Sequence, residues 1–205
     1  MQIRFATNLS AHEYVRRGAW RDVTLITCPL HSKGGCGFAR HGTYSRQTPR
    51  GTKIARWYCP AGHSTFSLLP DCLSSRLPGS LIEIETAINK VEDAPSQEAA
   101  VHDLRLDIGL TGVLRWIRRR LFLIRTTLTL FTELFADLQD CRPCISSFRV
   151  ALGVEHVLPA LRMYAGPSLY VLPPPVGFGP RPRRKKGKKP PFQHKTGTDP
   201  PLKRE

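Results

Sequence analysis

The sequence predicts an α+β fold, with a small N-terminal β-hairpin module, a mainly α-helical region after it, and a disordered basic tail. Three observations predict this order. Cysteine and histidine residues flank a hairpin pattern within residues 25–72, and apolar residues recur at helical spacing between residues 80 and 164. Residues 166–205 are rich in Pro, Gly, Lys and Arg, which is typical of a disordered segment. Residues 1–24 form a polar lead-in to the hairpin module.

Two clusters of potential metal ligands flank the expected hairpin. Cys28 and Cys36 precede it, and Cys59 and His63 follow it. Such paired knuckles, opposed by the strands between them, bind one tetrahedral zinc ion in a zinc ribbon. We therefore expect Zn²⁺ bound by Cys28, Cys36, Cys59 and His63, with His31 as the alternate ligand. The alternative is a set of buried cysteines and surface histidines that bind no metal.

The hairpin itself is expected to consist of strands at 38–46 and 52–58, joined by a Pro-Arg-Gly turn. Basic and aromatic side chains alternate along it, an arrangement that suits contacts with phosphates and bases. The basic candidates for DNA binding are Arg40, Arg46, Lys53 and Arg56, beside Tyr44, Trp57 and Tyr58. A solvated polar face over a few core aromatics is the competing interpretation.

Three helices are expected within residues 80–120, in the order of a helix-turn-helix. Ser80 and Glu83 have the spacing of a capping box, and Ser96 precedes a second, short helix. The third helix begins after Thr111 and concentrates positive charge near its N-terminus, which opposes the helix dipole. A phosphate partner would offset that cost, so Arg115, Arg118 and Arg119 are predicted to contact DNA. A solvated basic face is the alternative.

The third helix is expected to continue within a region spanning residues 112–164. Apolar residues keep 3–4 spacing from Leu114 to Leu138, over a stripe too wide for a two-stranded coiled coil. A homodimer through residues 114–138 and packing on short helices within residues 145–164 are both consistent with this stripe.

The net charge of +15 is unevenly distributed. Residues 1–72 hold ten Lys and Arg against three Asp and Glu, residues 73–165 hold eleven of each, and residues 166–205 hold ten against two. A neutral centre between basic ends indicates a polyanionic partner. We expect that partner to be double-stranded DNA and not a membrane, because no apolar run reaches the roughly 18 residues that a spanning helix needs. The best candidate is interrupted by Arg118, Arg119, Arg120 and Arg125.

Two segments resemble a transposase-associated family of uncharacterised bacterial proteins that combines a zinc ribbon with a helix-turn-helix. The first runs from Cys28 through Arg56-Trp-Tyr-Cys59-Pro-Ala-Gly-His63, and the second from Ser96-Gln-Glu-Ala-Ala to Trp116-Ile-Arg-Arg. The similarity covers about residues 25–120. It implies that ribbon and helix together recognise the ends of a mobile element, with the ligand and DNA-facing residues named above.

The sequence predicts a binding protein and not an enzyme. After residue 120 no strand-rich run can build the sheet that carries a transposase carboxylate triad, and no phosphate-binding loop or nucleophile–histidine pair stands out. We expect no small-molecule substrate. The cysteine cluster and the polar N-terminal residues favour a cytoplasmic, nucleoid-associated protein. The alternative function is a protein-interaction or oligomerisation scaffold with a solubilising basic tail.

Overall fold

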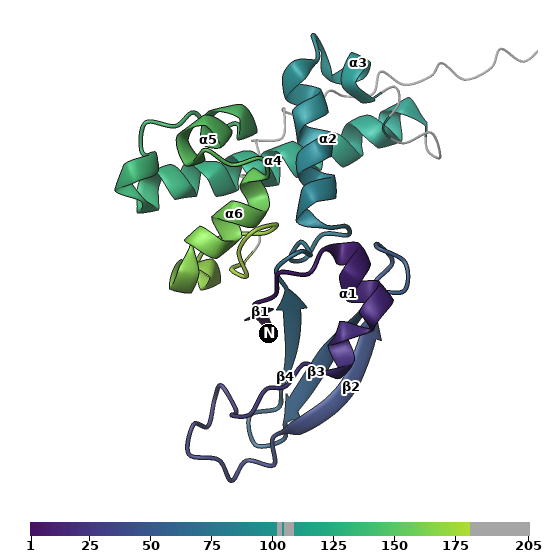
Figure 1. Ribbon diagram of the computed structural model, residues 1–205, viewed down its shortest axis with the longest axis vertical. Helices are drawn as coiled ribbons and strands as arrows, with labels where there is room; N and C mark the ends of the chain where they lie inside the picture. The colour runs from purple at the N-terminus through teal and green to yellow at the C-terminus, as the bar shows by residue number, and fades with distance from the viewer. Residues whose placement is uncertain (102–103, 105–108, 181–205) are drawn as a thin grey trace, which may run out of the picture.

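The computed structural model describes residues 1–101, 104 and 109–180. It has mixed α+β architecture: a four-stranded sheet, with helices α2–α6 gathered beyond one end of it (Figure 1). The strands are β1 (Gln2–Phe5), β2 (Ala39–Ser45), β3 (Lys53–Cys59) and β4 (Ser64–Pro70). The helices are α1 (Ala11–Arg17), α2 (Leu81–Asp93), α3 (Gln97–Val101), α4 (Leu110–Leu134), α5 (Ile145–Leu152) and α6 (Val157–Tyr164), with short 3₁₀ helices η1 (Ala19–Arg21), η2 (Ala136–Leu138) and η3 (Gly166–Tyr170).

The sheet has the strand order β1-β4-β3-β2. The expected hairpin is confirmed as β2 and β3, which pair antiparallel with a bulge between Arg40 and Thr43. β4 continues the antiparallel sheet, with Phe66 opposite Trp57, and β1 lies parallel to β4. The lead-in expected at residues 1–24 therefore supplies a strand and a helix to the same sheet unit.

One face of the sheet is covered by α1 and η1. Tyr14 of α1 is fully buried against this face, and its hydroxyl donates to the backbone oxygen of Lys53 at 3.2 Å. Trp20 packs with it, and the sheet contributes Trp57 and Phe66 to the same apolar cluster. A Ser10–Glu13 capping box begins α1, and Gly18 in the left-handed conformation ends it.

The helices form a second and larger core. The predicted capping box of Ser80 and Glu83 begins α2, as expected. α4 ends at Leu134, earlier than the predicted Leu138, because Phe135 is extended and η2 follows. The apolar stripe of α4 is buried inside the chain, and its buried members include Ile117, Leu121, Ile124, Leu128 and Phe131. The stripe that suggested a homodimer is thus filled by the chain's own helices, and α5 and α6 confirm the two short helices expected after residue 144.

The side chain of Arg162 joins three segments at the junction of the sheet with the helices. It is fully buried in α6, and its guanidinium donates to backbone oxygens. Those acceptors lie at the end of β4, just after it, and near the end of the described residues: Pro70, Asp71, Leu73, Pro175 and Val176. The same group lies 5.4 Å from the ring centroid of Phe178.

The prediction of disorder from residue 166 is wrong for residues 166–180. Leu169, Leu172 and Val176 are buried in the helical core. The density of Pro and Gly in this stretch suggested a linker. Its apolar residues pack in the helical core instead, and its backbone oxygens accept hydrogen bonds from Arg162. The strongly basic part of the expected tail, residues 181–205, lies outside the described residues. Among the helices of the described ranges, none is long and apolar enough to cross a membrane.

Candidate metal centre

The first part of the candidate metal centre is a glycine-rich loop between η1 and β2. It lies at the end of the sheet far from α2–α6 (Figure 1). Cys28 and His31 are one tight turn apart, since the amide of His31 donates to the backbone oxygen of Cys28 at 3.2 Å. Gly35 and Gly37, with φ of 75° and 67°, flank Cys36 in a conformation that side chains with a Cβ rarely adopt. These glycines let the loop reverse and direct Cys36 back toward Cys28.

The second part is the turn that joins β3 to β4. Cys59 is the last residue of β3 and is fully buried. The amide of Gly62 donates to the Cys59 sulfur at 3.3 Å. A Cβ on Gly62 would lie 3.4 Å from both that sulfur and the His31 ring, so the turn packs closely on the cluster. An amide aimed at a thiol sulfur is the arrangement that stabilises a thiolate.

Four side chains meet between these two parts. One ligand atom from each of Cys28, His31, Cys36 and Cys59 lies within 4.8 Å of all the others. The Nδ1 atom of His31 is 3.6 Å from the Cys28 sulfur and 3.3 Å from the Cys59 sulfur. The three cysteines are buried, and all are free thiols. This group could hold a metal ion.

The electrostatics of the cluster favour one thiolate. Burial acts to raise the pKa of Cys28, but hydrogen bonds from the His31 side chain and from the amides of Leu30 and His31 outweigh it and lower this pKa to about 6. Burial raises the pKa of Cys59, and the neighbouring thiols add to that rise. A thiolate at Cys28 therefore disfavours a second thiolate at Cys59.

The structure corrects one expected ligand. His63, placed in the set by its spacing from Cys59, is exposed and is not a member of the group of four. Its φ of 44° places it at the end of the turn, immediately before β4 begins. His31, the alternate ligand, occupies the position instead, because the Cys28 turn directs its ring toward Cys59. The three cysteines of the expected set all belong to this group, which could hold a metal ion.

Three of the arginines predicted to contact DNA bind parts of this chain. The guanidinium of Arg40 donates to the backbone oxygens of Trp20 and Arg21 at 2.6 and 2.8 Å. Arg46 donates to the backbone oxygens of Ser74 and Leu77, so it holds β2 to the segment before α2. Both residues help to assemble the sheet unit, a role that the charge pattern alone did not reveal.

Arg118 is the third of these, and it remains partly available. Its Nε donates to the Gln97 side chain of α3 at 3.1 Å, and its Nη2 lies 3.8 Å from a Glu98 oxygen. The side chain is still 56% exposed. Among the other DNA-binding candidates, Arg115, Arg119 and Lys53 are exposed and Arg56 is half-buried.

The sequence has no match among protein-family models, curated proteins or solved structures. The site and the basic surfaces are therefore interpreted from their own geometry.

Proposed function

We propose that this is a zinc-stabilised DNA-binding protein. Zn²⁺ fits the candidate metal centre by donor type, because three thiols and one imidazole form a common ligand set of structural zinc sites. The distances agree as well. Tetrahedral zinc, with bonds of about 2.3 Å to sulfur and about 2.0 Å to nitrogen, would separate those two atoms by about 3.5 Å. The two nitrogen–sulfur distances of His31 are 3.3 and 3.6 Å.

The proposed role of zinc is structural. Four protein ligands leave no open position for a substrate or a reactive water, which is typical of a closed site. The cysteines also belong to the apolar cluster that holds α1 on the sheet. Zinc would therefore stabilise the sheet unit, and DNA binding would depend on charged side chains elsewhere. That the protein is not an enzyme stays a prediction.

The charge of the sheet unit supports a polyanionic ligand. Residues 1–72 contain three acids. Glu13 is engaged in the capping box of α1, and both carboxylate oxygens of Asp71 accept from Arg4 at 2.8 and 2.9 Å. With two of the three carboxylates engaged in this way, the excess of basic residues is little compensated by nearby negative charge.

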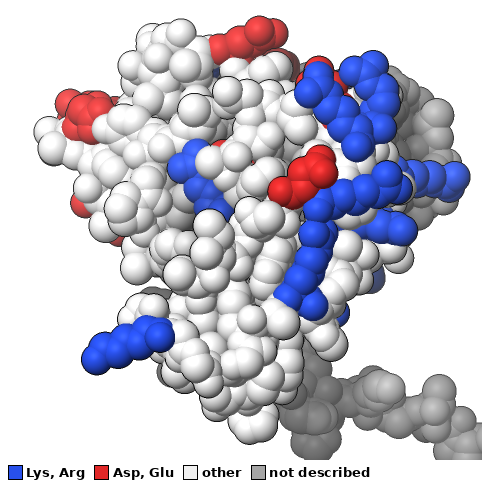
Figure 2. Space-filling view, turned by 60° about the horizontal axis from the view of Figure 1, so that its bottom comes forward, with Lys and Arg blue, Asp and Glu red and all other residues white. Residues whose placement is uncertain are grey.

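The observation that carries the proposal is the exposed basic face of α4. Arg115, Arg119 and Arg125 are exposed along this helix, and Arg118 is more than half exposed. No acidic residue occurs in α4 before Glu133. Basic side chains are not confined to this helix: Figure 2, in which the sheet end of Figure 1 comes forward, shows Lys and Arg gathered on one side of the face in view, with few Asp or Glu among them. Arginines with this spacing suit a duplex, whose phosphates recur along a groove wide enough for a helix.

A helix-turn-helix role for α2, α3 and α4 belongs to this proposal. The three helices pack on one another, and Arg118 ties α3 to α4 through Gln97. Part of the connection between α3 and α4 lies outside the described residues. The link to a mobile element rests on the sequence resemblance alone and stays a prediction.

The proposal is tested by the salt dependence of duplex affinity. The full chain should bind a labelled DNA duplex with log K falling linearly with log salt, at about 0.9 per phosphate neutralised. Replacing Arg115 and Arg119 together with Ala should reduce that slope by about 2 and weaken binding by roughly 1–3 kcal/mol for each residue that reaches a base.

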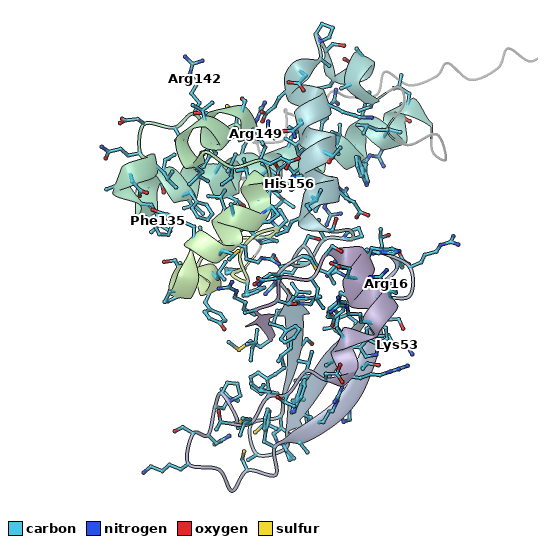
Figure 3. The ribbon with its side chains drawn as sticks, in the orientation of Figure 1. Arg16, Lys53, Phe135, Arg142, Arg149 and His156 are labelled. Atoms are coloured by element: carbon cyan, nitrogen blue, oxygen red, sulfur yellow. The ribbon has the colours of Figure 1, made fainter. Side chains whose placement is uncertain are left out.

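The matched control is Arg142→Ala. Arg142 is exposed and points away from the molecule on the opposite side from α1 (Figure 3). Its removal changes the net charge by one without touching α4, so its effect measures non-specific attraction. If Arg115 and Arg119 can be removed at no greater cost per charge than Arg142, α4 is not the DNA-contacting helix and the proposal fails.

A further inference from the structure

The second face of the sheet differs sharply from the face that α1 covers. Paired residues point to the same side of a sheet, and side chains alternate along each strand. The registers of β3 with β4 and of β1 with β4 therefore place one set of residues on the side opposite Trp57 and Phe66. Part of this side is covered, because Ile54 and Leu69 are buried in the helical core. We call the uncovered part the open face; its residues are His41, Tyr44, Arg56, Tyr58, Thr65 and Ser67.

Aromatic rings and a guanidinium form two contacting pairs on the open face. The rings of His41 and Tyr58 are 5.6 Å apart between centroids. The guanidinium of Arg56 lies 5.9 Å from the centroid of the Tyr44 ring. His41 is exposed, and the other three are half-buried, so this part of the face is accessible to solvent. Arg40 faces Trp57, so His41, the next residue along β2, lies on the opposite side with Tyr58.

The open face also lacks negative charge. None of the four strands contains Asp or Glu. Asp71 follows β4 directly, but its carboxylate is paired with Arg4 and is only 12% exposed. The half-buried Thr65 and Ser67 add hydroxyl groups beside Tyr58 and Arg56. A polar solvated face is usual for an antiparallel sheet, so the feature that points to a ligand is the set of accessible rings beside an arginine with no acidic residue in the strands.

We propose that the open face binds single-stranded nucleic acid. Bases would stack on Tyr58 and His41, and Arg56 would contact the phosphates. Sheets with accessible aromatic residues bind unpaired bases in this way, because every base has a face that can stack. A duplex cannot offer those faces, since its bases are stacked on one another. The site goes beyond the proposed duplex binding and uses none of the α4 arginines.

The proposal is tested with the full chain and a fluorescent oligothymidine of about 15 nucleotides, measured by anisotropy. Tyr58→Leu keeps apolar bulk but removes the aromatic face, and it should weaken binding about tenfold. Tyr58→Phe keeps the ring and should bind like the parent. The matched control is Tyr164→Leu, the same change on α6, where the side chain is 41% exposed. This control should leave affinity unchanged.

Folding and duplex binding are measured in parallel. Each variant should melt within a few degrees of the parent, and its affinity for duplex DNA should stay the same. Should Tyr58→Leu unfold, Arg56→Gln with His41→Ala provides a second test on a half-buried and an exposed side chain, with the same expected loss of single-strand affinity.

A photo-cross-link locates the strand independently. An oligonucleotide containing 5-bromodeoxyuridine should cross-link to the peptide that carries Tyr58, as identified by mass spectrometry. Cross-links confined to α4 or to residues 181–205, or a Tyr58→Leu variant with unchanged single-strand affinity, would overturn the open-face site. Neither outcome bears on whether Arg115 and Arg119 bind a duplex, so the two proposals can fail separately.

Discussion

Glu85 and Glu92 lie two turns apart on α2, and each caps the N-terminus of a different helix. Glu85 accepts from the amides of Val157 and Leu158, which begin α6, at 2.9 Å each. Glu92 accepts from the amides of Ile145 and Ser146, which begin α5, at 2.8 and 3.1 Å. Neither helix has a side-chain cap of its own. α2 therefore supplies both carboxylates: each accepts hydrogen bonds from the free N-terminal amides of α5 or α6 and interacts favourably with the dipole of that helix.

We predict that Glu85→Gln and Glu85→Ala destabilise the protein far more than Glu92→Ala. Glu85 is 1% exposed and also pairs with Arg149 at 3.2 Å, so its loss leaves two buried amides without an acceptor and Arg149 without its carboxylate partner. The cost should be about 3 kcal/mol, against about 1 kcal/mol for the partly exposed Glu92. Urea denaturation measures both free energies of unfolding. Equal costs would mean that burial does not set the strength of these caps.

The metal site gives a prediction that separates the two histidines. His31→Ala should lose bound zinc or hold it far more weakly, whereas His63→Ala should retain full stoichiometry, because His63 is exposed outside the group of four. Elemental analysis gives the stoichiometry. Cobalt substitution gives the ligand set, since cobalt bound to thiolates absorbs strongly in the near ultraviolet. The opposite pattern would restore His63 as the ligand.

Removing the metal should unfold the sheet unit before the helices. Cys28, Cys36 and Cys59 share one apolar cluster with Trp20 and Trp57, whereas the helices have their own core. Structural zinc supplies folding free energy, so a chelator should expose these two tryptophans to water and leave most of the helical circular dichroism. A Trp116→Phe background confines the fluorescence signal to the sheet unit. Unchanged emission after complete zinc loss would contradict this prediction.

The thiols outside the metal site should differ in reactivity. Burial raises the pKa of Cys72 to about 11, so at pH 8 only about 0.1% of it is thiolate, against roughly a tenth or more for an ordinary thiol. Because its pKa is raised, reactivity should appear only as the pH rises toward 11. Cys141 and Cys144 are partly exposed and should be alkylated first. Timed iodoacetamide labelling with peptide mass spectrometry measures the order in which the thiols react. Early labelling of Cys72 would show that the surroundings that bury it open.

Local signals predicted part of the fold well. The Ser80–Glu83 spacing located the start of α2, and the Pro-Arg-Gly turn located the hairpin. The same Ser-x-x-Glu signal at Ser10 and Glu13 marks α1, so that helix was predictable and was missed. β1 carries no comparable signal, because it depends on parallel pairing with Ser64–Pro70, which lies about sixty residues away.

The candidate metal centre was likewise predictable only where local sequence signals determine it. That the three cysteines lie together was predictable from knuckle spacing, but the fourth member of the group was not. His31 and His63 both follow a cysteine closely, and only the path of the loop between η1 and β2 brings one of them to Cys59. The basic residues were harder still. Whether an arginine faces solvent or donates to a backbone oxygen, as Arg40 and Arg46 do, depends on contacts that charge patterning does not encode.

The five backbone acceptors of Arg162 also determine how much of the chain must be synthesised before the junction between the sheet and the helices can form. Two of them, Pro175 and Val176, come after α6 in the sequence. In a nascent chain that ends with α6, the Arg162 guanidinium therefore lacks two of its acceptors and is costly to bury. The junction between the sheet and the helices can close only once residues 173–178 have been synthesised. Any shortened chain made for crystallisation or binding work should therefore end after Phe178.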